Sequence, residues 1–310
     1  MKARLRRGLQ ELAQASGWSS RRAAGIGRPR ILMYYRPIAE GALPPAVFEA
    51  QLAWLKRHTE LLPLRELLDR LEAGRCNGRE VALTFDDGLE NHADVVWPLL
   101  RRERVPATIF VCPGLAEVQG QVWNLELRLR WNSLPASQQQ ALAERLGLPS
   151  ASDEALIVHA KRLGLAPRRA LEAQVQAATP DWHPSERDRP RIRAMGWAAL
   201  REMDPALIDF GCQSMTHPIL THLDEAEAQV EIVDSRRLLE ERLQRPVDTF
   251  VYPNGDADAA VFERVAAHYR AGFSSSPGFA DAATQRTWID RIPAAEDMAR
   301  FLWRMHRPGW

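Results

Sequence analysis

The 310-residue sequence has little of what marks a secreted, membrane-spanning or nucleic-acid-binding protein. Its three cysteines are odd in number and scattered without CxxC spacing, which argues against a disulfide framework and favours a reducing compartment. No apolar run reaches the roughly twenty residues that cross a bilayer, and the first thirty residues lack the apolar core of a signal peptide. A net charge of +1 argues against a general nucleic-acid binder. We therefore expect a cytoplasmic protein without nucleic-acid partners or transmembrane segments.

Positive charge is nevertheless concentrated in residues 1–30. This segment carries eight lysines and arginines against the single acid Glu11. Such a basic N-terminal arm is either a solvated extension or a contact for an acidic partner or anionic lipid, which would place the protein at the periphery of the inner membrane. Both interpretations stay open, and we take residues 31–310 as the folded region.

Short apolar segments alternate with amphipathic helical patterns over most of the remaining chain. Strands that alternate with helices pair in parallel, and about seven such units are typical of an α/β barrel or a wide doubly wound sheet. The predicted strands are "RILMYY" (30–35), "EVALTF" (80–85), "ATIFVC" (107–112), "ALIDFG" (206–211), "VDTFVY" (247–252), "AGFSSS" (271–276) and, more weakly, "TWIDRI" (287–292).

Residues 113–205 interrupt this alternation. They contain several helical patterns and no good strand, so we expect a helical insertion on a loop at the carboxyl end of a strand, where substrate-binding elaborations collect. Its tryptophans Trp123 and Trp131 fit either a wall that stacks on sugar rings or ordinary core packing.

The segment "VALTFDDGLENH" (81–92) places two carboxylates side by side at the end of a buried strand. Adjacent like charges raise one pKa at the expense of the other, so Asp86 and Asp87 are unfavourable together unless a cation or a proton lies between them. A simple turn is the alternative, since Asp and Gly are ordinary turn residues. In a parallel barrel, however, the carboxyl ends of strands face the active site. We therefore favour a functional pair.

Two further strands lead into polar segments. One continues into "CQSMTHPILTHL" (212–223), which contains Gln213, Ser214, Thr216, His217 and His222. Another continues into "PNGD" (253–256), a turn whose backbone N–H groups are suited to stabilise a developing oxyanion. We expect both segments to converge with the two carboxylates at one mouth of the barrel.

Four stretches together resemble the polysaccharide deacetylases of carbohydrate esterase family 4, which share the NodB-homology fold. They are "ILMYYRP", "LTFDDGLENHADVVWPLLRRERVPATIFV", "GCQSMTHPIL" and "RPVDTFVYPNG", the last followed by "AGFSS" and "DRIP". The resemblance implies a distorted (β/α) barrel of about seven strands. It also implies a metal-dependent hydrolase that removes acetyl groups from an N- or O-acetylated sugar of a polysaccharide or glycolipid precursor.

The same resemblance implies roles for individual residues. Asp86 matches the general base, Asp87 and His217 match ligands of a divalent metal, usually zinc, and Arg291 of "DRIP" could orient Asp86 by a charge-assisted hydrogen bond. The metal would polarise the acetyl carbonyl and lower the pKa of its bound water. The remaining candidate contacts to substrate or oxyanion are Tyr35, Tyr252, Asn254 and Trp123.

The sequence departs from the family pattern at the metal site. Gln213 replaces the first imidazole ligand, and a neutral amide oxygen is a poorer zinc ligand than imidazole. The site is therefore weakened, rebuilt with help from His222 or His92, or without metal. Tyr35 and Asn254 also replace a histidine and an aromatic residue of many relatives, and His306 lies in no recognisable motif. The alternative to an enzyme is a degenerate barrel that binds a glycan or a partner without turnover.

Overall fold

The computed structural model describes residues 2–280 and 285–309, and seven parallel strands within these residues close into a ring. Around the ring the order is β1-β8-β7-β6-β5-β4-β3, and β1 pairs with β3 to complete it. This arrangement confirms the predicted α/β barrel and excludes an open doubly wound sheet. The strands are β1 (Arg30–Tyr34), β3 (Glu80–Phe85), β4 (Ala107–Val111), β5 (Ile208–Cys212), β6 (Thr249–Val251), β7 (Ala271–Pro277) and β8 (Ile289–Pro293), with the short β2 (Glu60–Leu61) added beside the start of β3.

The barrel is distorted because its strands pair over unequal lengths. β1 and β3 pair in register from Arg30 opposite Val81 to Tyr34 opposite Phe85, whereas β5 and β6 pair only at Cys212 and Phe250. Every residue of β1, β3 and β4 is buried, because one face of these strands fills the barrel and helices cover the other. Parallel strands buried on both faces read as continuous apolar runs, which explains why the sequence revealed them.

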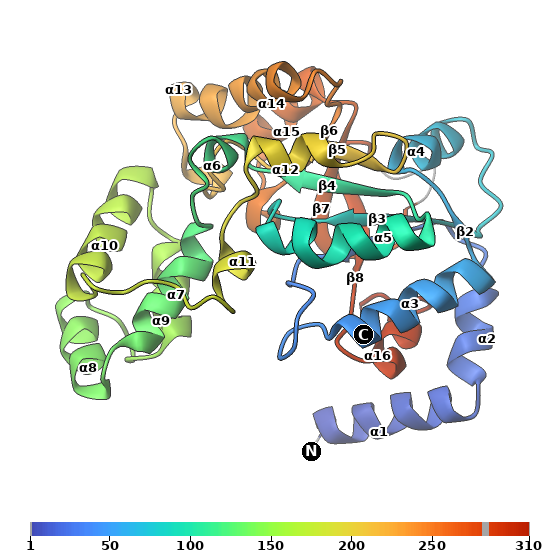
Figure 1. Ribbon diagram of the computed structural model, residues 1–310, viewed down its shortest axis with the longest axis horizontal. Helices are drawn as coiled ribbons and strands as arrows, with labels where there is room; N and C mark the ends of the chain where they lie inside the picture. The colour runs from blue at the N-terminus through green and yellow to red at the C-terminus, as the bar shows by residue number, and fades with distance from the viewer. Residues whose placement is uncertain (1, 281–284, 310) are drawn as a thin grey trace.

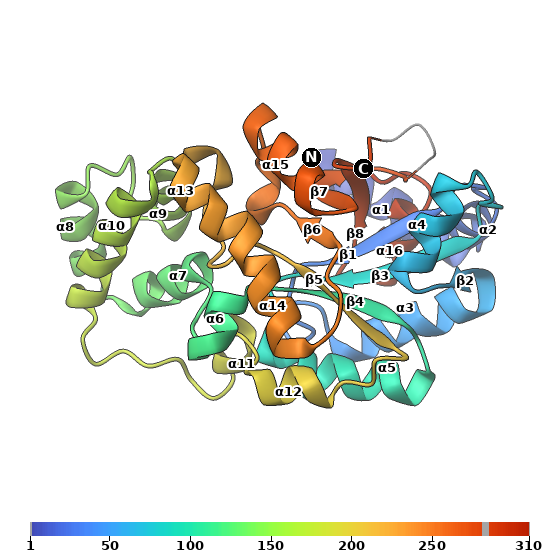
Figure 2. The same ribbon diagram turned by 90° about the horizontal axis from the view of Figure 1, so that it is seen from above.

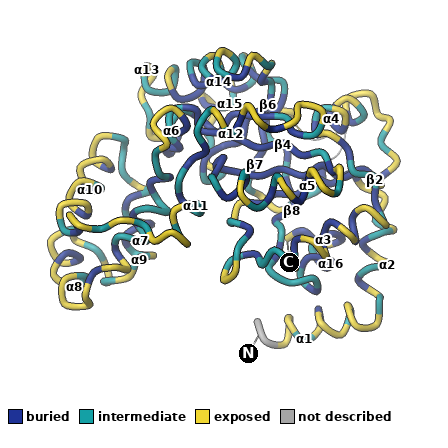
Figure 3. The backbone as a smooth tube through the Cα atoms, in the orientation of Figure 1, coloured by how far each residue is buried: buried dark blue, intermediate teal, exposed yellow. Residues whose placement is uncertain are grey.

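Helices surround the barrel, as Figures 1 and 2 show. The covering elements are α3 (Pro45–His58), α4 (Leu64–Glu72), the π-helical turn η1 (His92–Val96), α5 (Trp97–Glu103), η2 (Leu220–His222), α13 (Glu225–Ala228), η3 (Gln229–Asp234), α14 (Ser235–Leu243), η4 (Pro253–Gly255), α15 (Ala259–His268) and α16 (Met298–Arg304). In Figure 3 the strands of the barrel lie in its most deeply buried part, and the helices carry the exposed residues on their outer faces.

Between β4 and β5 the chain is helical and adds no strand to the sheet, and the structure describes all of residues 113–205. Its helices α7 to α10 project to one side of the barrel and share a separate apolar core that includes Trp123, Leu127 and Trp131. The elements are α6 (Pro113–Val118), α7 (Trp123–Ser133), α8 (Ala136–Arg145), α9 (Asp153–Ala160), α10 (Leu165–Ala178), α11 (Arg189–Ile192) and α12 (Trp197–Glu202).

The basic N-terminal segment is helical. It forms α1 (Lys2–Ala15) and α2 (Trp18–Ala24), and both contact α16. Arg30, counted with the basic arm from the sequence, is instead fully buried at the start of β1, where its Nη1 donates a hydrogen bond to the Ala23 carbonyl at 2.6 Å. Within the described residues, no helix combines the length and the apolar character needed to span a bilayer.

Candidate active site

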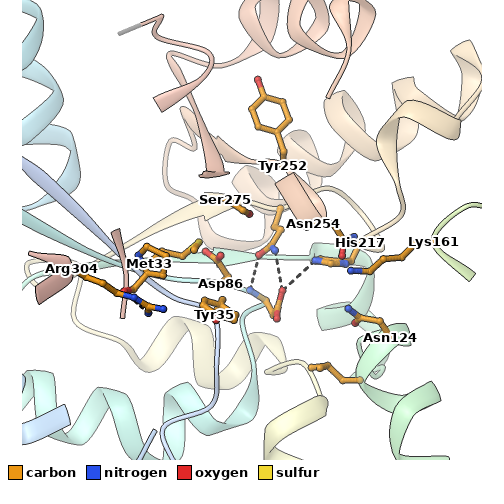
Figure 4. A pocket seen from close by; sticks show the side chains of 14 residues that line it. Met33, Tyr35, Asp86, Asn124, Lys161, His217, Tyr252, Asn254, Ser275 and Arg304 are labelled. Atoms are coloured by element: carbon orange, nitrogen blue, oxygen red, sulfur yellow. Dashed lines mark hydrogen bonds and ion pairs between the residues drawn. The ribbon is translucent and has the colours of Figure 1, made fainter. Parts of the chain in front are cut away.

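A pocket of about 420 Å³ opens at the carboxyl ends of the strands (Figure 4). The ends of six strands, β1, β3 and β5 to β8, and the segments that follow them supply its floor, and the helical insertion and α16 supply its walls. Parallel topology explains this convergence, because the carboxyl ends of all the strands meet at one end of the ring. The lining residues are Met33, Tyr35, Asp86, Asp87, Asn124, Leu125, Lys161, Gln213, His217, Tyr252, Asn254, Ser275, Pro293 and Arg304.

Asp86 lies directly after β3 and forms a bidentate ion pair with Arg291 of β8. Arg291 Nη1 and Nη2 donate to the two carboxylate oxygens of Asp86 at 2.7 and 2.9 Å. The guanidinium is fully buried, and it also donates to Thr84 Oγ1 and to the Ser274 carbonyl. This arrangement fixes the plane of the Asp86 carboxylate, because each of its two oxygens accepts a charge-assisted hydrogen bond from the same guanidinium.

Asp87 adopts a left-handed backbone conformation, with φ of 72°. Gly88 follows with φ of 60°, and a Cβ there would lie 3.2 Å from the Val111 backbone, so glycine is favoured at this position of the turn. Burial and, secondarily, the Asp86 charge raise the pKa of Asp87 to about 7, although the Gln213 amide and Arg291 oppose the shift. Burial thus contributes more than the like-charge repulsion that the sequence suggested.

Gln213 is bound to Asp87 by two hydrogen bonds. The Asp87 backbone N–H donates to Gln213 Oε1 at 2.6 Å, and Gln213 Nε2 donates to Asp87 Oδ1 at 2.9 Å. The first bond determines how the amide is oriented, because a backbone N–H only donates and must therefore face the amide oxygen. The amide consequently directs an N–H donor, not a lone pair, at the carboxylate.

His217 completes this side of the pocket. Its Nε2 lies 3.4 Å from Asp87 Oδ1, and its backbone is left-handed with φ of 63°. Burial first, and then the nearby charges of Arg168 and Lys161, lower the pKa of His217 to about 4, so the imidazole is neutral near pH 7. The indole N–H of Trp123 donates to the His217 carbonyl at 2.8 Å and ties this turn to the insertion.

Comparison with known proteins identifies the family. Residues 73–271 match the family model described as polysaccharide deacetylase. The chain belongs to the polysaccharide deacetylase family. It is 37% identical over 68 residues to the poly-beta-1,6-N-acetyl-D-glucosamine N-deacetylase of Staphylococcus aureus, a match that covers 22% of this chain and 23% of that protein. The corresponding protein of Staphylococcus epidermidis is 35% identical over 65 residues, or 21% and 22% of the two chains.

Solved structures of deacetylases share the fold of this family member. The Streptococcus pyogenes deacetylase PplD in complex with acetate superposes with a TM-score of 0.61 at 19% identity, over 91% of this chain and 99% of that one. IcaB from Ammonifex degensii superposes with a TM-score of 0.57 at 16% identity, over 90% and 97%. At these identities the likeness establishes the distorted barrel and not the substrate.

The metal centre that the family resemblance implies is not matched by the residues present. A catalytic zinc site uses three protein ligands and keeps a further position for water. Asp87 and His217 could supply two, but the third position belongs to Gln213, whose amide oxygen accepts from a backbone N–H and whose nitrogen covers Asp87. The described residues contain no cluster of three His, Cys, Asp or Glu side chains suited to a metal. The donor set does not fit a three-ligand zinc site.

Neither candidate replacement ligand reaches this deacetylase-family pocket. His222 Nδ1 lies 3.2 Å from the Leu163 carbonyl, and His92 is buried with its ring against Phe85. Neither residue lines the pocket, so the interpretation of a site rebuilt with His222 or His92 is wrong. His306 packs against Trp18 and Trp303, also away from the pocket.

Two of the predicted substrate contacts need correction. The Tyr252 hydroxyl donates to the Thr287 carbonyl at 2.6 Å, and Figure 4 shows the ring turned away from the other pocket residues, so Tyr252 lines the pocket without directing its hydroxyl into it. Trp123 is buried in the core of the insertion, with the Arg168 guanidinium 4.5 Å above its ring. It therefore packs as core and does not form a sugar-stacking wall.

The other two predicted contacts do line the pocket. Tyr35 is 43% exposed, so one face of its ring is accessible at the mouth. Asn254 has a left-handed backbone with φ of 58°, and its buried Nδ2 has no hydrogen-bond partner among the described residues. A buried amide without a partner requires an explanation, and a bound acceptor would provide one.

Sequence reasoning missed the residues that the walls contribute. Lys161 follows α9, and Figure 4 places it beside His217, whose pKa its charge helps to lower. Asn124 of α7 lies on the same wall, and Arg304 of α16 lines the pocket while Nη1 donates to the Pro293 and Ala294 carbonyls. No local motif marks these residues, because their positions depend on how the insertion and α16 dock on the barrel.

Proposed function

We propose that the protein hydrolyses the acetyl group of an N- or O-acetylated sugar in a polysaccharide or glycolipid precursor. The observation that carries this proposal is the Asp86–Arg291 pair, which holds one carboxylate in a fixed orientation at the floor of the pocket. The pocket volume falls within the range of small-ligand sites and suits a sugar unit with its acetyl group. Family membership supports the reaction class.

In this proposal Asp86 acts as the general base. It takes a proton from a water molecule, whose oxygen then attacks the acetyl carbonyl carbon. Collapse of the tetrahedral intermediate breaks the bond from that carbon to the sugar nitrogen or oxygen, and the proton held by Asp86 passes to this leaving atom, which releases acetate. The negative charge that develops on the carbonyl oxygen needs donors in a partly buried site, and Asn254 Nδ2 and the Lys161 ammonium are the available groups. Tyr35 offers an aromatic face at the mouth for an apolar face of the sugar.

The arrangement of Gln213 argues that zinc binding is weak or absent. It also favours the second candidate function, a barrel that binds an acetylated glycan without turnover, because the family's usual source of carbonyl polarisation is missing at this position. The two candidates differ in one respect: the enzyme needs Asp86 as a base, and the binding protein does not.

Hydrolysis assays with an acetylated chromogenic ester and with acetylated amino-sugar oligomers separate the two candidates. We expect the wild-type protein to turn over at least one of these substrates, and Asp86→Asn to lower turnover by about 10²–10⁴-fold, the range for loss of a general base. Elemental analysis and assays with chelator or added Zn²⁺ determine the metal dependence. Oligomer binding without turnover under any metal condition would support the binding protein.

A further inference from the structure

Helix α1 exposes apolar side chains to solvent. Leu5, Leu9 and Leu12 are 68%, 49% and 70% exposed, and Trp18, at the start of α2, is 43% exposed. The three leucines are spaced by four and three residues, so they form one stripe along the helix. Single exposed leucines are ordinary on protein surfaces, but a stripe of three on one helix is a feature of interaction surfaces.

The packing of α1 leaves this stripe uncovered. The helix contacts α16 and α2, and Gln10 is its most buried described residue at 4% exposure. In an ordinary surface helix the leucines would face the protein and the glutamine would face water. Figure 1 shows α1 at the lower edge of the molecule, and Figure 3 shows it mostly exposed. Within its described side chains α1 therefore packs through Gln10, with Gly8 and Ala13 partly buried, and directs its leucines outward.

Exposed arginines lie on the same two helices, and the acids Glu296 and Asp297 act on one of them, Arg7. Arg6 and Arg7 lie on α1, and Arg21 and Arg22 lie on α2. The only acid in residues 1–30 is Glu11, which pairs with Arg7 at 2.9 Å. The Arg22 guanidinium also lies 6.0 Å from the ring of Trp18, so positive charge and apolar surface adjoin.

We propose that α1 and the start of α2 dock on an anionic lipid surface, with the leucine stripe and Trp18 in the interfacial layer and the arginines on the lipid headgroups. A basic helix with leucines on one face and a nearby tryptophan is the composition that lies in the plane of a membrane interface. The charge favours this occupant, because an anionic leaflet attracts the exposed Arg21 and Arg22, whereas an uncharged apolar partner would not. This inference is independent of the proposed hydrolysis.

Vesicle binding by the full-length protein tests the proposal. Sedimentation with vesicles of phosphatidylcholine alone, and with vesicles of phosphatidylcholine and phosphatidylglycerol in equal parts, measures partitioning. We expect at least about tenfold tighter binding to the anionic vesicles, and weaker binding as salt rises from about 0.1 M to about 1 M, since the screening length falls from roughly 10 to 3 Å. Equal binding to both vesicles, or binding to neither, contradicts the proposal.

Substitutions on the stripe show whether α1 is the contact. Glutamine keeps a helix propensity close to that of leucine, so Leu5→Gln/Leu9→Gln/Leu12→Gln preserves the helix. Burying even one leucine is worth more than a tenfold change in affinity, so we expect this variant to bind anionic vesicles at least about tenfold more weakly. The matched control replaces three exposed valines far from α1 in sequence and should bind like the wild type: Val118→Gln/Val158→Gln/Val230→Gln.

Two further measurements make the result decisive. Arg21→Gln/Arg22→Gln should weaken binding several-fold at low salt and have little effect at high salt, as expected for a headgroup contact. Circular dichroism and thermal melting check that all variants keep the fold. If the wild-type protein is a dimer that the leucine variant converts to monomers, and neither binds vesicles, the surface joins two copies of the chain and the membrane proposal is wrong. Equal losses in the stripe variant and the valine control also overturn it.

Discussion

The two adjacent carboxylates of the pocket lie in opposite electrostatic environments. Asp86 faces the fully buried guanidinium of Arg291, which meets it with two charge-assisted bonds. The side chains in direct contact with the Asp87 carboxylate are neutral, the Gln213 amide and the His217 imidazole, and burial is the main cause that raises its pKa to about 7. Neighbouring acids therefore do not share one role. The buried Arg291 guanidinium binds Asp86. The neutral Gln213 amide binds Asp87, at the position where the family resemblance implies a metal ligand.

The largest effect should follow from removal of the cation on the Asp86 side. Arg291→Met leaves the Asp86 carboxylate buried without its partner, and breaking such a pair typically destabilises a protein by about 3–5 kcal/mol. Urea unfolding measures the change. The control is Arg102→Met, which removes an exposed arginine that pairs with Glu49 and Glu103 and should cost far less stability, because solvent screens exposed ion pairs. Similar losses of unfolding free energy in both variants would show that the Asp86–Arg291 pair stabilises the fold no more than an exposed ion pair does.

On the Asp87 side, neutralisation should stabilise the protein. The folded-state pKa of Asp87 is raised to about 7 from 3.8, so its stabilising contribution is complete below about pH 4 and is lost as the pH rises through about 7. Asp87→Asn removes this loss and also tolerates the left-handed backbone. We expect the variant to gain stability over the wild type as the pH rises from 4 to 7, by up to about 4 kcal/mol.

Urea unfolding at several pH values measures this gain. His217, whose pKa is lowered to about 4, has the opposite pH dependence: its contribution is present above about pH 6.5 and is lost as the pH falls toward 4. Both proteins retain His217, so its effect largely cancels in the difference. A stability difference that does not change with pH would contradict the raised pKa of Asp87.

The Gln213 side can be converted toward the family's ligand pattern. Gln213→His removes the amide that covers Asp87 and adds an imidazole beside His217. Loss of supporting contacts alone typically changes metal affinity by about 10–100-fold, so we expect zinc affinity to rise by at least about tenfold. Calorimetry measures it, with Gln213→Asn as the control that lacks an imidazole. No gain in zinc affinity would mean that Asp87 and His217 are not held in ligand geometry.

The smallest effect concerns Lys161, which lies on the His217 side of the pocket. If its ammonium stabilises the developing oxyanion or orients the sugar, Lys161→Met should lower kcat/KM for acetylated oligomers by about 10-fold, and Lys161→Arg should recover part of the loss. Steady-state kinetics and a thermal melt of each variant provide the measurement. A melting temperature that falls together with activity would assign Lys161 a structural role instead.

The barrel and the floor of its site follow from local sequence. The segment 80–85 was predicted as a strand and is β3 to the residue, and the other predicted strands differ by one or two residues at their ends. Buried parallel strands can be recognised in a sequence because apolar residues on both faces give a continuous apolar run. Asp86, Asp87, Gln213 and His217 could be placed together because each follows a strand and parallel strands end at one side.

The walls of the site could not be predicted in the same way. Trp123 has an aromatic ring of the kind that stacks on sugars, but the packing of α7 against the neighbouring helices buries it. The hydroxyl of Tyr252 bonds to the Thr287 carbonyl, far along the chain. Lys161 carries no motif and reaches the pocket only because the insertion docks beside His217. Each outcome depends on contacts between distant segments, which local patterns do not encode.

The sequence alone thus determined the parallel barrel, the family resemblance and the substitution of a metal-ligand histidine by Gln213, since these depend on periodicity and on residue identity at strand ends. Only the tertiary structure decided that Gln213 binds Asp87 through two hydrogen bonds and that the leucines of α1 face solvent rather than the protein. An amphipathic pattern shows which residues can be buried, and an amide side chain can form hydrogen bonds with many partners. Which partner each residue finds depends on which surfaces come together when the chain folds.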